Sequence, residues 1–124
     1  ITMIASCEDC NTAQKDGAPI EGMRFAGGME FDLPIGTVRT VNITPDPETG
    51  IGSWTEEMFV NRFKGYDPDS TAFIPVKKED FNTPMPWIMY AGMTEEDLRA
   101  IYAFLMSNKP VSNAVNRFTP PSKY

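Results

Sequence analysis

Histidine is absent from this chain of 124 residues, and cysteine occurs only twice. The absence of histidine excludes any site for which this chain itself must supply an imidazole. The two cysteines, Cys7 and Cys10, lie close together in the sequence, so they cannot join distant parts of a fold, and the chain is not a disulfide scaffold. A zinc or iron–sulfur site needs a larger set of cysteine or histidine ligands than this pair provides.

Positive charge and long apolar runs are also scarce. The chain has 11 Lys and Arg against 17 Asp and Glu, a net charge of −6, which argues against a protein that binds nucleic acid through its phosphates. No stretch approaches the ~18 to 20 consecutive apolar residues of a membrane helix, so we expect no transmembrane segment in this chain. The length fits one domain. Because the sequence opens as ITMIASC without an initiating Met, we expect the N-terminus to be incomplete.

The first half of the chain combines a short helical pattern with many turn residues. Met3, Ile4 and Cys7 have helical spacing, which predicts the end of an amphipathic helix that runs into the cysteine pair. Glycine and proline recur throughout residues 16–52 and predict a long loop region, with short extended pieces near 30–33 and 37–41. Long loops in a compact domain need something to wrap around, and a bound cofactor would fill that role.

Two further helices are predicted in the second half. The first spans 54–64, where Ser53 or Thr55 can cap its N-terminus and Gly65 ends it. The second spans 94–108, where Thr94 and Asp97 form a variant capping box. Its apolar face predicts the core, which we expect to form where this helix crosses the N-terminal helix; the face consists of Leu98, Ile101, Tyr102 and Leu105. Four prolines between the two helices, at 68, 75, 84 and 86, predict a loop.

Five segments carry a resemblance to a known family. They are IASCEDCNT at 4–12, FAGGMEF at 25–31, NITPDPETGIGSWTEEMF at 42–59, TPMPW at 83–87 and MTEEDLRAIYAFLMS at 93–107. In type and order they resemble class I cytochrome c, and in detail the cytochrome subunits of bacterial dehydrogenases. The resemblance implies an all-α fold of about four helices, with long Gly/Pro-rich loops around a haem. It implies a cytochrome c-like domain over residues 1–112, followed by a C-terminal tail over 113–124.

The resemblance also implies a cofactor and its site. Cys7 and Cys10 would form thioethers to one covalent haem c, and Met85 would be the distal iron ligand. The residues that would line the haem edge and its propionates are Asn42, Ile43 and Trp54. In this family the residue after the second cysteine is the histidine that binds iron on the proximal side, and here that position is Asn11.

Other interpretations of these residues stay open. On the proximal side iron could meet the Asn11 amide, water, a deprotonated Lys15 or a histidine from another chain. Met85 could be core filler, because methionine adapts to irregular gaps, and Trp54 could be an ordinary core aromatic. The cysteines could be free thiols or a disulfide.

Two functions follow from the resemblance. The first is electron transfer to and from a redox partner, either a dehydrogenase or another cytochrome, by a chain that is not itself an enzyme and is periplasmic or otherwise exported. The second is a cytochrome-like module, haem-free or open at one face of the haem, that binds a ligand or a protein. The missing histidine is the feature that separates them.

Overall fold

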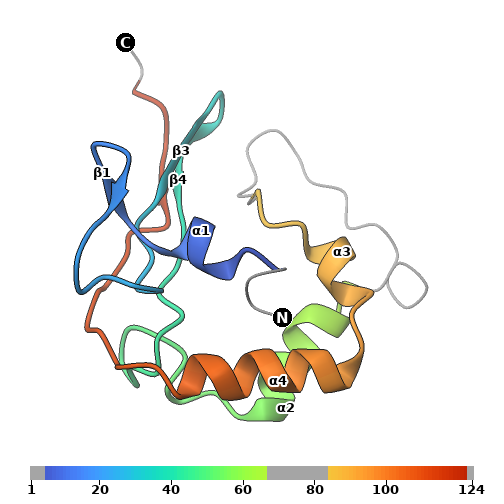
Figure 1. The fold of residues 1–124 in the computed structure, drawn as a ribbon. Helices are drawn as coiled ribbons and strands as arrows, with labels where there is room; N and C mark the ends of the chain where they lie inside the picture. Colours follow the sequence, from blue (N-terminus) through green and yellow to red (C-terminus); the bar gives the residue numbers. More distant parts are fainter. Residues whose placement is uncertain (1–4, 67–83, 123–124) are drawn as a thin grey trace.

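The computed structural model describes residues 5–66 and 84–122, and in these residues it contains helices and strands (Figure 1). The helices are α1 (Cys7–Asn11), α2 (Glu56–Lys64), α3 (Trp87–Ala91) and α4 (Glu95–Met106). The strands are β1 (Gln14–Lys15), β2 (Ala18–Pro19), β3 (Glu30–Leu33), β4 (Gly36–Arg39) and β5 (Phe118–Thr119). No helix in the described part is long and apolar enough to cross a membrane.

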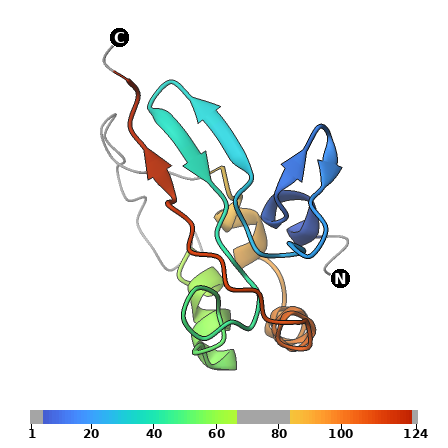
Figure 2. The ribbon, with the colours of Figure 1, turned by 90° about the vertical axis from the view of Figure 1, so that its left-hand side faces the viewer.

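The expectation of an all-α fold is wrong, because the strands form two antiparallel sheets. In one, β1 pairs with β2, and in the other the order is β3-β4-β5. Figure 2 shows the larger sheet with the C-terminal strand beside β4. Its register pairs Glu30 with Arg39 and Val38 with Phe118. The physical reason is that backbone N–H and C=O groups in a Gly/Pro-rich region still need hydrogen-bond partners, and strand pairing supplies them.

The two long helices agree with the prediction. The α2 helix begins after Thr55, whose hydroxyl accepts a hydrogen bond from the Met58 N–H at 3.1 Å. The α4 helix begins after Thr94, whose hydroxyl accepts from the Asp97 N–H at 3.1 Å. Both caps satisfy a backbone donor that a helix N-terminus otherwise leaves free.

Helix α3 was not expected, because Pro84 and Pro86 favour a loop. Pro86 instead stands at the N-cap of α3, where the missing N–H of proline costs no helical hydrogen bond. The predicted proline-rich loop also includes residues 68 and 75, which lie outside the described residues.

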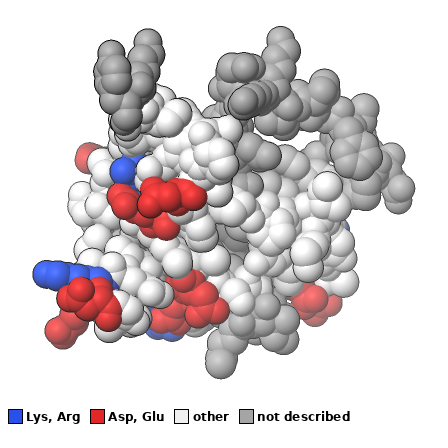
Figure 3. All heavy atoms as spheres, turned by 90° about the horizontal axis from the view of Figure 1, so that it is seen from above, with Lys and Arg blue, Asp and Glu red and all other residues white. Residues whose placement is uncertain are grey.

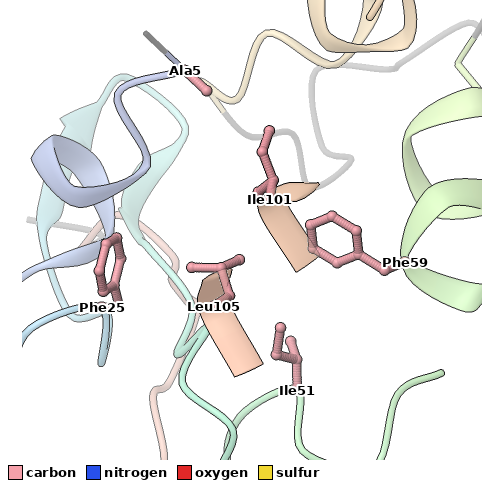
Figure 4. Close-up of a cluster of buried hydrophobic side chains, with 6 residues drawn as sticks. All are labelled: Ala5, Phe25, Ile51, Phe59, Ile101 and Leu105. Carbon is pink, nitrogen blue, oxygen red and sulfur yellow. The ribbon is translucent and has the colours of Figure 1, made fainter. Parts of the chain in front are cut away.

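The predicted apolar face of α4 is confirmed as core. Leu98, Ile101 and Leu105 are buried, and the half-buried Tyr102 donates a hydrogen bond to the carbonyl of Trp54 at 2.8 Å. In Figure 4, Ile101 and Leu105 lie among four other buried side chains: Ala5, Phe25, Ile51 and Phe59.

The helix that packs against α4 in the described part is α2. The N-terminal segment contributes Ala5 to the same cluster, and the earlier part of the expected N-terminal helix, with Met3 and Ile4, lies outside the described residues. The core therefore joins segments from both ends of the chain.

The C-terminal segment is held by backbone pairing. The Arg39 N–H donates to the Arg117 carbonyl at 2.9 Å, and β5 extends the sheet beside β4. The division into a domain over 1–112 and a tail over 113–124 stays a prediction. In the described residues, the start of the tail is tied to the loops by Asn113, which donates to the Ala26 carbonyl at 2.9 Å.

Candidate functional site

The two cysteines lie on α1, one at each end of a single helical turn. Cys7 is half-buried and packs against the core cluster, whereas Cys10 is exposed. Both are free thiols. One sulfur therefore borders the apolar interior and the other borders solvent.

Helix α1 is too short to be stable alone, and the loop over residues 24–28 holds it in place. The Gly27 N–H donates to the Asn11 carbonyl at 2.7 Å, and the Phe25 N–H donates to the Thr12 hydroxyl at 3.0 Å. On the outer surface, Arg24 makes a two-point ion pair with Glu8, at 2.8 and 2.9 Å. This loop fixes the orientation of the cysteine-bearing turn.

The loop depends on an unusual backbone conformation at Phe25 and Gly27. Gly27 has a φ of +76°, and a Cβ there would come within 2.4 Å of the Val41 backbone, so only glycine fits. Phe25 is buried and has a φ of +60°, which is rare for a bulky residue. Its backbone N–H and C=O are both hydrogen-bonded, to Thr12 and Ile43, which compensates for the strained conformation.

Asn11 uses its amide group for structure. Its Nδ2 donates to the Val41 carbonyl at 2.8 Å, which links the end of α1 to the chain after β4. The other candidate for the proximal ligand, Lys15, is exposed at the end of β1. The described structure thus gives the Asn11 amide nitrogen a backbone partner.

Three of the predicted site residues gather around one core. Cys7, Ile43 and Trp54 all pack against the cluster of Figure 4 while staying partly exposed. The other residues in that position are Phe63, Tyr90, Met93, Tyr102 and Met106. We call this whole set, Cys7 included, the apolar rim: aromatic, aliphatic and sulfur-containing side chains that border the core cluster.

Asn42 lies apart from this rim and has a structural role. Its side chain is buried, and its Nδ2 donates to the Thr49 hydroxyl at 3.1 Å and to the Val111 carbonyl at 2.8 Å. Its Oδ1 accepts from the backbone N–H of Thr44 at 2.9 Å and from its hydroxyl at 2.7 Å. Asn42 therefore joins the loop after β4 to the C-terminal segment.

Met85 is half-buried, directly before α3. Its carbonyl accepts a hydrogen bond from the Trp87 N–H at 2.9 Å, so its backbone is fixed to the start of this helix. It is not among the described residues of the apolar rim. Helix α3 packs against α2, so the position of Met85 follows from that contact.

Two residues that hold α3 were not predicted from the sequence. The Tyr90 hydroxyl donates to the carbonyl of Ala5, just before the cysteine-bearing turn. The Lys64 ammonium donates to the carbonyls of Ala91 and Met93 at the C-terminal end of α3. Pro86 could have indicated that a helix begins here, since proline is common where helices begin. A predicted α3 would then have raised the question of which side chains hold it.

Burial governs the electrostatics of the site. It raises the pKa of the Cys7 thiol, and the nearby charge of Cys10 adds to this effect. Burial also raises the pKa of Tyr90, with further contributions from the charges of Cys7 and Cys10. Burial therefore favours the protonated form of both the Cys7 thiol and the Tyr90 phenol.

These residues fit a covalently held haem in part. Two free thiols one turn apart, one of them at an apolar rim, suit thioether attachment to an apolar ring. Axial ligation fits less well, because the chain has no imidazole and the Asn11 amide oxygen is a weak-field donor for haem iron. Met85 offers a thioether sulfur, which is one of the protein ligands that haem iron accepts.

Comparison with known proteins identifies several relatives. The chain is 38% identical over 114 residues to the cytochrome c subunit of a quinone alcohol dehydrogenase from Gluconobacter oxydans. It is 34% identical over 110 residues to the cytochrome c subunit of gluconate 2-dehydrogenase from Pantoea cypripedii, and 32% identical over 113 residues to the fructose dehydrogenase cytochrome subunit from Gluconobacter japonicus. No family model matches the chain.

The matches include most of this chain but a minor part of each relative. They span 90%, 87% and 90% of the chain, in the order given, against 21%, 22% and 21% of the relatives. The chain therefore spans about a fifth of the length of the curated relatives it matches. The resemblance seen in the sequence is confirmed: the chain is homologous, over most of its length, to one segment of the cytochrome c subunits of bacterial dehydrogenases.

Proposed function

We propose that this chain is a c-type cytochrome domain that carries electrons between a dehydrogenase and another redox partner, and that it is exported to the periplasm. The observation that carries the proposal is a pair of free thiols one helical turn apart, with Cys7 in the apolar rim, in a chain homologous to cytochrome c subunits. The dehydrogenase partner is proposed from the names of the relatives.

Each proposed residue has a distinct task. Cys7 and Cys10 would hold one haem through thioether bonds, Ile43 and Trp54 would line the haem edge, and Met85 would supply sulfur to the iron. When bound, the haem supplies reversible one-electron chemistry at its iron. The apolar rim would keep water from the part of the haem that it contacts, and Cys10 would attach the haem at the exposed side of α1.

The surface supports docking by an uncharged face. Figure 3 looks down on the molecule of Figure 1, and most of the charge visible on the described residues lies on the side of the β1–β2 hairpin. Helix α3 lies on the opposite side and contains no charged residue, and its Ile88 and Met89 side chains are 51% and 75% exposed. We propose that the redox partner approaches near α3.

Covalent attachment of haem can be tested by measuring the mass of the denatured protein. The purified protein should have a denatured mass equal to the polypeptide plus one haem, and should show a haem spectrum in a pyridine haemochrome assay. Cys7→Ser and Cys10→Ser should each leave one thioether, and the double variant should release the haem on denaturation. A denatured mass equal to the bare polypeptide would overturn the proposal.

Ligation is the feature in which this chain departs from its family. Because the chain supplies no imidazole and an amide oxygen is a weak-field ligand, we propose that the proximal side of the iron is open or held by water. The native protein should then be partly high-spin and should bind added imidazole. Asn11→His should give a low-spin spectrum that no longer responds to imidazole.

A matched variant controls for the mere presence of an imidazole in the chain. Asn61→His places the same side chain on the exposed surface of α2 and should leave the spectrum and the imidazole titration unchanged. A native protein that is already low-spin and ignores imidazole would contradict the open proximal side and would indicate a nitrogen ligand such as Lys15 or a group from another chain.

One observation favours a second function. The Asn11 side chain binds the Val41 carbonyl, and its carbonyl accepts from Gly27, so this position is stable without any iron. A haem open on that side would bind a small ligand, and the chain would then act as a ligand-binding module. Tight binding of imidazole together with slow electron exchange with a dehydrogenase would favour this function over that of a carrier.

A further inference from the structure

Helix α3 is too short to hold its own position. It has five residues, its N-cap residue Pro86 provides no side-chain hydrogen bond, and isolated helices shorter than ~12 residues are marginal in water. Its place in the molecule therefore depends on side chains from other segments. Because Met85 directly precedes α3 and its carbonyl binds the Trp87 N–H, whatever holds α3 also holds Met85.

The end of α2 and the turn after it hold α3 on one side. Phe63 contacts Trp87 and Tyr90 with ring centroids 5.4 and 6.0 Å apart, respectively. Tyr66 stacks on Trp87 at 4.9 Å, and the Arg62 guanidinium lies 4.9 Å from the centre of the same ring. These contacts attach α3 to α2 and to the turn after it. They do not involve the segment that carries the cysteines, so a different contact must connect α3 to that segment.

That group is the hydroxyl of Tyr90. It donates to the Ala5 carbonyl, and Ala5 is buried in the core cluster two residues before Cys7. Tyr90, like Cys7, also packs against the core cluster. One hydrogen bond thus connects the segment that carries Met85 to the segment that carries the cysteines.

We propose that Tyr90 is a positioning residue that couples α3, and Met85 with it, to the cysteine-bearing segment. The Met85 part of this role rests on the proposed haem function, whereas the coupling between α3 and residues 5–11 does not. Lys64 acts at the other end of α3 by binding the Ala91 and Met93 carbonyls, where a cation also favours the helix dipole.

The test compares two matched variants of the purified protein. Tyr90→Phe and Tyr102→Phe each remove one hydroxyl from a half-buried ring, and each hydroxyl donates to a backbone carbonyl, Ala5 for Tyr90 and Trp54 for Tyr102. Native-state hydrogen exchange is then measured amide by amide. It reports local opening of each segment whether or not haem is attached.

In Tyr90→Phe, the hydrogen-exchange rates of the α3 amides and of the Asp9 amide in α1 should rise about fivefold. This is the increase expected when a local opening loses one hydrogen bond. The α4 amides should be unchanged. Tyr102→Phe should not speed exchange in α3. Unchanged α3 exchange in Tyr90→Phe, or an equal increase in both variants, would overturn the coupling.

A second variant and a second readout separate this inference from the proposed function. Lys64→Met should speed exchange in α3 without affecting the Asp9 amide, because it loosens only the far end of the helix. In protein that carries haem, Tyr90→Phe should also lower the reduction potential relative to Tyr102→Phe, because methionine ligation raises it. If no haem is found, the proposed function fails and the exchange data still decide whether Tyr90 couples the two segments.

Discussion

The helical half and the loop half of this molecule are stabilised by different kinds of contact. The helical half comprises α2, α3 and α4, and its buried side chains are almost all apolar, with Phe59, Leu98 and Leu105 at its centre. The loop half comprises residues 12–52 and 109–119. It contains the buried polar side chains of the described part: Thr12, Asn42 and Thr44.

The helical half is stabilised mainly by apolar packing, and the loop half also depends on directed hydrogen bonds. Apolar packing in the helical half depends on side-chain volume and tolerates small shifts, whereas the hydrogen bonds around Asn42 require particular donors and acceptors. Helix α1 joins both halves, because Asn11 and Thr12 bind the loops and Cys7 packs against the core. The proposed site therefore needs both kinds of contact to be intact.

The largest effect is expected from the core of the helical half. Leu98→Ala or Leu105→Ala should lower the free energy of unfolding by ~2–5 kcal/mol, because each removes a fully buried side chain and leaves a cavity. Chemical denaturation measures the loss, with Met58→Ala on the exposed face of α2 as a control. A loss below ~0.5 kcal/mol at both positions would mean that this face is not the core.

A smaller but more local effect is expected in the loop half. Asn42→Ala should cost about 2–3 kcal/mol, because it removes hydrogen bonds to Val111 and Thr44 and leaves buried groups without partners. Hydrogen exchange should rise in residues 42–52 and 111–113 before it rises in α4. The haem-lining role of Asn42 stays a prediction, and a changed haem spectrum with unchanged stability would favour that role over the structural one.

Removing a helix cap should destabilise the helical half less than a core substitution does. Thr94→Ala and Thr55→Ala should each cost about 1 kcal/mol, because each removes the hydroxyl that accepts a backbone N–H at a helix start. Thermal unfolding of the two variants and of their Ser counterparts measures this effect. Serine should restore most of the stability, and no difference between Ala and Ser would show that the hydroxyl is not the cause.

The smallest expected effect is the change in stability with pH that comes from Cys7, on the helix that joins the two halves. The folded pKa of Cys7 is raised above its ordinary value of 9.0, chiefly by burial, so folding favours the protonated thiol. Its contribution to stability is present below pH 9.0 and is lost as the pH rises through the raised pKa. Protein without haem should lose stability in this range, and Cys7→Ser should lose less. A thioether has no proton to lose, so protein with attached haem should not show this component.

The sequence determined the elements that depend on local chemistry. Thr55 and Thr94 cap the predicted helices, because the capping contact spans only three residues. The α4 face was also predictable, because an amphipathic helix shows its buried side in its own spacing. For the site, the spacing of Cys7 and Cys10 and the resemblance indicated the family, which the relatives confirm.

Only the tertiary structure decided what depends on distant partners. The extended pieces predicted near 30–33 and 37–41 correspond to β3 and β4, but the sequence did not show their pairing. Nor did it show the pairing of β4 with the two-residue strand β5, about eighty positions away, so the all-α expectation from the resemblance was wrong. Asn11 binds Val41, Asn42 binds Val111 and Tyr90 binds Ala5, and in each pair a side chain meets a backbone carbonyl far away in the sequence. Every residue has such a carbonyl, so the sequence cannot identify the partner, and only the folded chain brings the two groups together.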